Sequence, residues 1–154
     1  MQIRNRHERI VAAAPERVAA LIADFDRVWP TEIAPAPRRR GPRLYDVGLM
    51  LWEEFDRPAA MRAFRVVRPE ELQGEHWFEL ELADGGTVLR HTIEGSATGR
   101  YEAIWRERIE PLHDLILEAL LDNVASAAAA GGGQPGARRA MVRAPGPRAG
   151  PPCE

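Results

Sequence analysis

Two histidines and one glutamate are the side chains of this sequence best suited to chemistry. His7 and His91 both fall on the apolar side of segments that alternate with a period of two. Imidazoles titrate near neutral pH, so a pair facing a cavity could bind the polar head of a ligand or serve as acid and base. Glu54 would join them if Trp52, two positions away, points inward, because burial would raise its pKa. The alternative for all three is a structural role in the core or at its rim.

Metal binding is not predicted from the histidines. His76 and His113 belong to other segments than His7 and His91, and the spacings match no metal-ligand motif. The run GGGQPG lacks the lysine and hydroxyl of a phosphate-binding loop, and the sequence has no nucleophile elbow or dinucleotide fingerprint. We therefore expect a protein without a metal or a cofactor.

Aromatic side chains are the candidates for contact with an apolar ligand. Burial of each contributes about 1.5 to 3 kcal/mol wherever it packs, so energetics alone cannot separate a ligand contact from core filling. The orientation of Trp52 is open, because Leu49 and Leu51 compete with it for the inner face. The candidates are Trp29, Trp52, Phe64, Phe78, Tyr101 and Trp105.

A long amphipathic helix from Tyr101 to Ala127 is expected to position several of these residues. Its apolar residues recur three and four positions apart, while acidic residues and arginines occupy the other face. Such a helix spans about 40 Å at 1.5 Å per residue, enough to cross a small domain. Pro111 removes one backbone hydrogen bond, which predicts a kink near residues 107–111 or a break there. Tyr101 and Trp105, ahead of this proline, are expected over the ligand.

The rest of the chain is predicted to form a sheet for that helix to cover. A strand over residues 2–12 is followed by a helix over about 15–24, begun by a proline and an acidic residue, and by a short helical turn over Asp26–Pro30. Thr31–Pro42, with three prolines and three arginines, is predicted to be a loop. Four strands follow, separated by turns short enough for antiparallel hairpins, at 46–55, 61–68, 75–83 and 86–95.

Composition favours one domain, residues 1–128, followed by a tail. The chain has 154 residues, of which 45% are hydrophobic and 29% charged, as in globular proteins with an ordinary core. All 21 basic residues are arginine, which excludes lysine Schiff-base chemistry. The net charge is −2, but residues 131–154 carry +3, so the rest of the chain carries about −5, which argues against nucleic acid as a partner of the folded part. Residues 129–154, rich in Gly, Pro, Ala and Arg, are predicted to be disordered and hold the single cysteine, Cys153.

Neither a signal peptide nor a membrane span is predicted. The N-terminus is charged, and the sequence has no run of about 18 apolar residues. We therefore expect a cytoplasmic protein. The sequence leaves the oligomeric state open.

The order of these elements resembles that of the helix-grip superfamily. The resemblance is carried by APERV ahead of the first helix, DFDRVWP at its end, the GG hairpin before VLRHTIEG and the helical ending, and it covers about residues 1–127. This superfamily, SRPBCC, includes START lipid-transfer domains, pollen-allergen-like proteins and bacterial polyketide cyclase/dehydrase proteins. The resemblance implies an α+β domain in which a curved antiparallel sheet wraps around a long C-terminal helix, with one or two short helices after the first strand. It implies six strands after the short helix, so a further strand is expected within Arg38–Tyr45.

The resemblance also implies a function. An apolar cavity between the sheet and the last helix would bind a hydrophobic or amphipathic small molecule. If the protein is an enzyme, the resemblance implies cyclisation or dehydration of a polyketide-like substrate by acid–base groups without a metal, with His91, His7 and Glu54 as candidates. The alternative is a non-catalytic lipid or ligand carrier, a sensor or a co-chaperone-like interaction module. The sequence does not decide between them.

Overall fold

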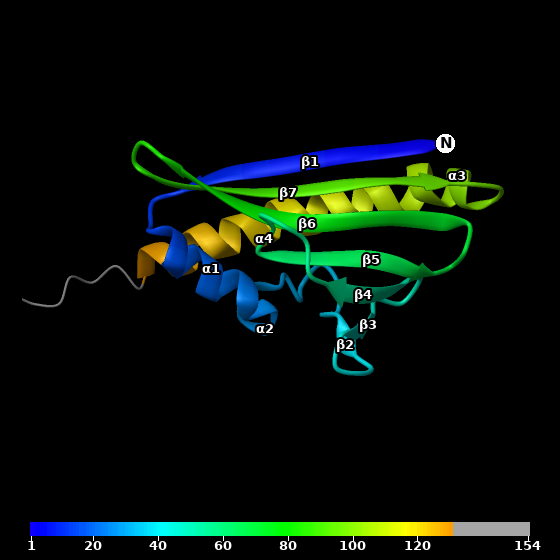
Figure 1. Ribbon diagram of the computed structural model, residues 1–154, viewed down its shortest axis with the longest axis horizontal. Helices are drawn as coiled ribbons and strands as arrows, with labels where there is room; N and C mark the ends of the chain where they lie inside the picture. The colour runs from blue at the N-terminus through cyan, green and yellow to red at the C-terminus, as the bar shows by residue number, and fades with distance from the viewer. Residues whose placement is uncertain (131–154) are drawn as a thin grey trace, which may run out of the picture.

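The computed structural model describes residues 1–130, which form a curved sheet with a long helix across one face (Figure 1). Of the predicted tail, positions 131–154 lie outside the described residues. The elements in chain order are β1 (Gln2–Val11), α1 (Pro15–Ala23), α2 (Phe25–Val28), β2 (Arg38–Arg39), β3 (Leu44–Asp46), β4 (Leu51–Phe55), β5 (Arg62–Arg68), β6 (Leu72–Ala83), β7 (Gly86–Ala97), α3 (Tyr101–Ile104), a π-helical turn (Trp105–Ile109) and α4 (Glu110–Ala130).

The strands of residues 1–130 form one seven-stranded sheet in the order β1-β7-β6-β5-β4-β3-β2. From β2 to β7 each strand pairs antiparallel with the next, and β1 pairs antiparallel with β7. The first and last strands are therefore neighbours, and their register places His7 directly opposite His91. Six strands follow the two short helices, and the predicted helix-grip fold class is confirmed.

The region between the short helices and β4 differs from the prediction. The segment Thr31–Pro42 was predicted to be a loop but contains β2, and the strand predicted at 46–55 begins only at Leu51. The cause is a turn that the apolar run concealed: the Asp46 side chain accepts a hydrogen bond from the Gly48 amide at 2.9 Å, and Gly48 has φ of 85°. The strand expected within Arg38–Tyr45 is present as the short pair β2 and β3.

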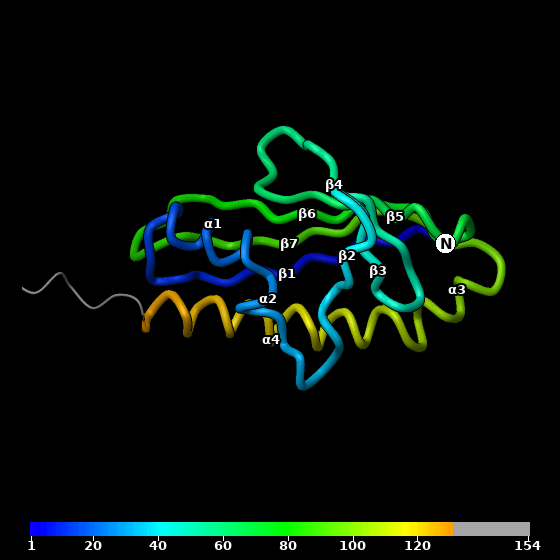
Figure 2. Tube along the Cα trace, turned by 90° about the horizontal axis from the view of Figure 1, so that it is seen from below, coloured from blue at the N-terminus to red at the C-terminus, as the bar shows by residue number. Residues whose placement is uncertain are grey.

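The C-terminal helical run continues past Pro111 without a break. Residues 105–109 form a π-helical turn, in which the Glu110 amide donates to the Trp105 carbonyl. Proline lacks an amide hydrogen and its ring presses on the carbonyl four residues back, so a wider turn just ahead of it relieves both problems. The interruption predicted near residues 107–111 therefore takes the form of this turn, and the helix lies along one face of the sheet as far as Ala130 (Figure 2).

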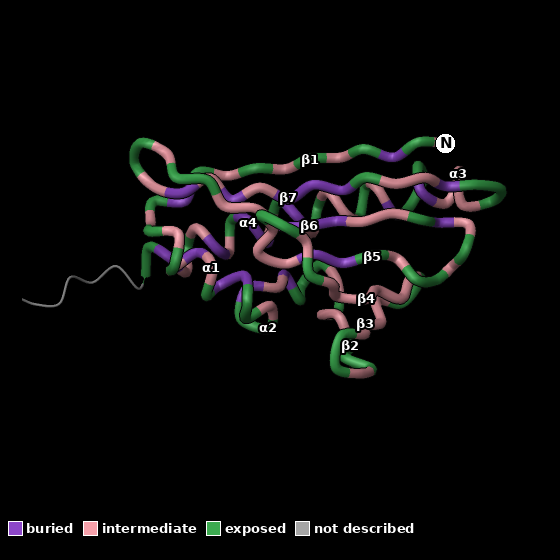
Figure 3. Tube along the Cα trace, in the orientation of Figure 1, coloured by how far each residue is buried: buried purple, intermediate pink, exposed green. Residues whose placement is uncertain are grey.

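The apolar core between the sheet and the helices is divided into two clusters. The larger one joins α1, the middle of the sheet and the second half of α4, and includes Leu21, Leu89 and Leu121. The smaller one joins the start of β1 to the π-helical turn, and includes Ile3 and Trp105. Buried segments follow the central strands and the helix face turned toward them, whereas β2 is exposed (Figure 3).

The inner face of β1 is polar because it lies against the acidic face of α4. Two residues along a strand advance by about 6.8 Å and four residues along a helix by about 6.0 Å, so alternate strand residues meet every fourth helix residue. These contacts tie the edge of the sheet to the helix. They join Asn5 with Asp114, His7 with Asp114 and Glu118, and Arg9 with Glu118 and Asp122.

Candidate functional site

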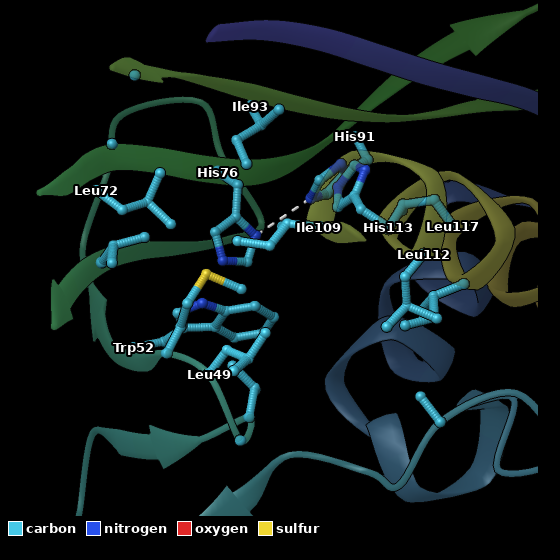
Figure 4. Close-up of a pocket in the computed structure, with 18 of the residues that line it drawn as sticks. Leu49, Trp52, Leu72, His76, His91, Ile93, Ile109, Leu112, His113 and Leu117 are labelled. Atoms are coloured by element: carbon cyan, nitrogen blue, oxygen red, sulfur yellow. Dashed lines mark hydrogen bonds between the residues drawn. The ribbon is translucent and has the colours of Figure 1, made fainter. Parts of the chain in front are cut away.

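A cavity of about 760 Å³ lies between the sheet and the C-terminal helix. This volume is within the range of sites that hold small molecules. Residues of both core clusters line it, so the cavity occupies the gap between them. Its walls are mostly apolar and include Leu49, Met50, Trp52, Leu72, Ile93, Ile109, Leu112 and Leu117 (Figure 4).

A pair of buried histidines interrupts this apolar wall. His76 on β6 and His91 on β7 are only 5% and 1% exposed, and Nδ1 of His76 lies 3.2 Å from Nε2 of His91 (Figure 4). The His76 ring stacks on Phe64 at 5.1 Å between centroids, and Trp52 meets it edge-on at 4.4 Å. These two aromatic contacts fix the orientation of the His76 ring.

Both imidazoles of this pair are neutral at pH 7. Burial, together with the positive charges of His113 and Arg62, lowers the pKa of His76 to about 3. Burial likewise lowers the pKa of His91 well below its ordinary value, and the neighbouring histidines lower it further. Since these groups carry no charge, the pair can exchange hydrogen bonds but offers no cation to a ligand.

The His76–His91 pair leaves two nitrogens free. In a bond between two neutral imidazoles one ring donates and the other accepts, and each then has a second nitrogen of the opposite kind. Nε2 of His76 and Nδ1 of His91 are these atoms, and within the described residues neither has a hydrogen-bond partner. Whichever tautomers are present, the buried pair therefore carries one unpaired donor and one unpaired acceptor.

The other two histidines continue the row toward the edge strand β1. His113 of α4 lies 5.2 Å from His91 between ring centroids, and burial lowers its pKa to about 4. His7 follows at 5.7 Å from His113, and its Nδ1 and Nε2 lie 2.7 Å from Glu118 and 3.0 Å from Asp114. His113 lines the cavity, but His7 does not. Of the two histidines predicted as candidates, only His91 therefore faces the cavity.

Glu54 lies outside the cavity and is held by partners. Arg62 donates to its carboxylate from Nε at 2.8 Å and from Nη2 at 3.2 Å, and the Tyr45 hydroxyl donates at 2.9 Å. Partial burial would raise the pKa of Glu54, but the hydrogen bonds and charge of Arg62 outweigh it and hold the pKa below its ordinary value. The expectation that burial would raise this pKa is therefore wrong, because the sequence did not reveal the arginine.

The six predicted aromatic residues are divided between the cavity and the packing around it. Trp52 points inward, which settles its open orientation, and it lines the cavity together with Trp29, Phe78 and Trp105. Phe64 is buried behind Trp52 and His76, and Tyr101 packs on the smaller core cluster. The helix beyond Pro111 also contributes cavity residues, Leu112, His113, Ile116, Leu117 and Leu120.

Three residues that matter here were not selected from the sequence. His76 alternates with Phe78 and Leu80, and His113 stands four positions from both Ile109 and Leu117, so each shared an apolar face that the pattern showed. Arg62 stands two positions before Phe64 on β5 and faces the same way. The periodicity predicts on which face of its strand or helix each residue lies, but it does not predict which side chains of other elements it contacts.

The fold is that of the helix-grip proteins, and comparison with solved structures agrees. Similar structures are the Zhui aromatase/cyclase from Streptomyces sp. R1128 (18% identity, TM-score 0.56, covering 84% of this chain and 94% of that one), a START superfamily protein from Mycobacterium smegmatis (15%, 0.50, 84% and 97%) and Ara h 8.0201 (16%, 0.55, 82% and 99%). At these identities the likeness shows the fold alone. No protein-family model matches the sequence, and no curated protein matches it either. Within residues 1–130, no helix is both long and apolar enough to span a membrane.

Proposed function

We propose that the protein binds an amphipathic small molecule in the cavity between the sheet and α4. The ligand has an apolar body and one neutral hydrogen-bonding group, a hydroxyl or a carbonyl. The observation that carries this proposal is the buried His76–His91 pair, in which two polar rings belong to the lining of a mostly apolar cavity and each ring keeps one unpaired nitrogen within the described residues. Two structures of the same fold, those of an aromatase/cyclase and of a START superfamily protein, support a ligand-binding role.

The neutral character of the polar group follows from the histidines. A buried donor or acceptor without a partner costs about 1 to 3 kcal/mol, and a ligand oxygen that pairs with it recovers part of that cost. A carboxylate placed against the histidine pair would need a cation there to offset its desolvation, and burial keeps both imidazoles uncharged at neutral pH; the arginines of the lining, Arg38 and Arg108, belong to other segments. The apolar walls contribute the remaining affinity, at about 25 cal/mol for each Å² removed from water.

A matched pair of probes tests this proposal. Naphthalene and 2-naphthol differ by one hydroxyl, and we expect 2-naphthol to bind about tenfold more tightly, a difference of about 1.4 kcal/mol. In His76→Leu the two affinities should converge while that of naphthalene is kept. Isothermal titration calorimetry measures both, and native mass spectrometry of freshly purified protein looks for a ligand already bound. If neither probe binds, the cavity is not a ligand site. If both bind the wild type with equal affinity, the cavity binds ligands but the histidines make no hydrogen bond to them.

A second candidate function is acid–base catalysis on the bound ligand, as in cyclisation or dehydration of a polyketide-like substrate. The His76–His91 pair favours it, because a neutral imidazole N–H can polarise a carbonyl without carrying charge. Aldol-type ring closure joins an enolate carbon to a carbonyl carbon and then loses water, so it needs proton transfers but no oxidant. His7 and Glu54, predicted as catalytic candidates, do not line the cavity. Unchanged turnover of a synthetic poly-β-ketone by His76→Gln and His91→Gln would leave binding as the function.

A further inference from the structure

A second histidine cluster lies at the edge of the sheet, between β1 and α4. His7, His113 and Asp114 each offer one possible ligand atom, and these three atoms all lie within 4.8 Å of one another. The sequence argued against a metal because it shows no ligand motif. The three residues are far apart in the sequence, His7 near its start and His113 and Asp114 in the last helix. Only the pairing of β1 with β7 and the passage of α4 across the sheet bring them together.

The separations between these atoms suit one small cation. His7 Nε2 lies 3.0 Å from Asp114 Oδ1, and His113 Nδ1 lies 3.4 Å from the same oxygen. Ligand atoms placed 2.0 to 2.1 Å from a tetrahedral zinc ion lie about 3.3 Å apart. Both distances to Asp114 are therefore close to the separation of two ligands on one zinc ion.

The residues around the cluster are placed as the supporting groups of a metal site. Glu118 lies 2.7 Å from Nδ1 of His7, so it can hold the tautomer that turns the lone pair of Nε2 to the ion. Asn5 donates from Nδ2 to the Asp114 carboxylate at 2.9 Å and orients it. The same Asn5 keeps a buried Oδ1, and His113 a buried Nε2, without a hydrogen-bond partner in the described residues.

We propose that His7, His113 and Asp114 bind a divalent transition-metal ion of the zinc type, which fastens β1 to α4. Two imidazole nitrogens and one carboxylate suit zinc or cobalt, whereas calcium and magnesium prefer oxygen ligands alone. Three protein ligands leave one position open for water. Because His113 also lines the cavity, the ion would hold one part of the cavity wall in place.

Cobalt titration tests the proposal directly. Protein without an affinity tag is treated with a chelator, and Co²⁺ is added while visible d–d absorption is recorded; we expect a tetrahedral spectrum with one equivalent bound, abolished by Zn²⁺. Asp114→Asn and His7→Ala should lower the affinity by at least about 100-fold, and Glu118→Gln by about tenfold. The matched control is Asp122→Asn, a carboxylate of the same helix that pairs with Arg9, and its affinity should not change.

The competing arrangement is a protonated His7 that bridges Asp114 and Glu118 without an ion. It predicts no d–d absorption in the wild type, and that result overturns the proposal. Absorption that survives in Asp114→Asn overturns it as well, because the cobalt would then be bound by other residues. Glu118→Gln leaves all three ligands in place, so its expected tenfold loss of cobalt affinity can be measured even if His7→Ala does not fold. An unchanged affinity would show that Glu118 does not orient His7 toward an ion. Binding of 2-naphthol by the chelated protein is measured in parallel, because the cavity proposal does not depend on the ion.

Discussion

Two polar groups are enclosed by the same fold, and they differ in how their hydrogen bonds are satisfied. Around Glu54, the Arg62 guanidinium and the Tyr45 hydroxyl fill the carboxylate's bonding positions. At His76 and His91, one hydrogen bond joins the rings and each keeps an unpaired nitrogen within the described residues. A buried ionisable group whose partners all lie in the chain has a complete structural explanation. One with unpaired atoms beside a cavity is a better candidate for contact with a ligand.

The lowered pKa values of the two groups have opposite meanings. The lowered pKa of Glu54 reflects a carboxylate that its arginine keeps charged. The lowered pKa values of His76 and His91 reflect imidazoles that burial keeps neutral. The direction of a shift alone therefore does not separate a structural ion pair from a binding site, whereas the charge state and the free atoms do.

The largest expected effect is acid destabilisation from the histidine pair. Below pH 6.5, the ordinary pKa of histidine, both imidazoles bind protons in the unfolded chain but not in the folded protein. The free energy of unfolding therefore falls as the pH falls. Each histidine contributes about 1.4 kcal/mol per pH unit, so the pair lowers the free energy of unfolding by about 4 kcal/mol between pH 7 and pH 5, and His113, whose pKa burial lowers to about 4, adds about 2 kcal/mol. Urea denaturation of chelator-treated protein at several pH values measures this change.

The Glu54 group loses its contribution in a different pH window. A carboxyl whose folded pKa is depressed stabilises the protein above its unfolded value of 4.5, and this contribution is lost only as the pH falls below it. His76→Leu should therefore remove about a third of the loss between pH 7 and pH 5, because His91 and His113 remain, and Glu54→Gln almost none of it. Equal effects of the two substitutions in this interval would contradict the distinction between the groups.

Removal of the arginine is expected to have the next largest effect. Arg62→Met leaves the half-buried Glu54 carboxylate without its cation and removes the guanidinium from the rings of Phe25 and Phe64, at 4.3 and 4.9 Å from their centroids. The expected loss is about 2 to 3 kcal/mol in the free energy of unfolding at pH 7.5, from chemical denaturation.

A double variant shows whether the unpaired charge is the cause. In a Glu54→Gln background no carboxylate remains to be isolated, so Arg62→Met should cost only about 1 kcal/mol. If the cost is the same in both backgrounds, the arginine acts through packing, and Glu54 is not part of a coupled group.

The sequence predicted what depends on periodicity and chain order. The alternation of His76, Phe78 and Leu80 assigns their common inner face, and the same period of two places His7 and His91 on the inner faces of strands that the structure pairs. The short strands β2 and β3 were harder to predict, because they depend on a turn held by one aspartate and one glycine.

The chemistry of the site was less predictable than its location. Which side chain meets Glu54 depends on the alignment of β4 with β5, a register that no local pattern encodes. In the same way, His113 reaches His7 and His91 only because α4 lies across the sheet at one position, set by packing along its whole length. Long-range contacts of this kind decide whether a histidine is charged, paired or free.

The smallest expected effect gives the sharpest contrast with Arg62. His76→Leu replaces the ring with an apolar side chain of similar size, so the packing against Trp52 and Phe64 is largely retained. The broken hydrogen bond to His91 costs about 1 kcal/mol, but the buried Nε2 that lacked a partner is removed as well, which recovers a similar amount. We expect the free energy of unfolding at pH 7.5 to change by less than about 1 kcal/mol, while the preference for 2-naphthol over naphthalene is lost. A loss as large as that of Arg62→Met would show that the pair holds the fold together, and the reason to assign it to a ligand would disappear.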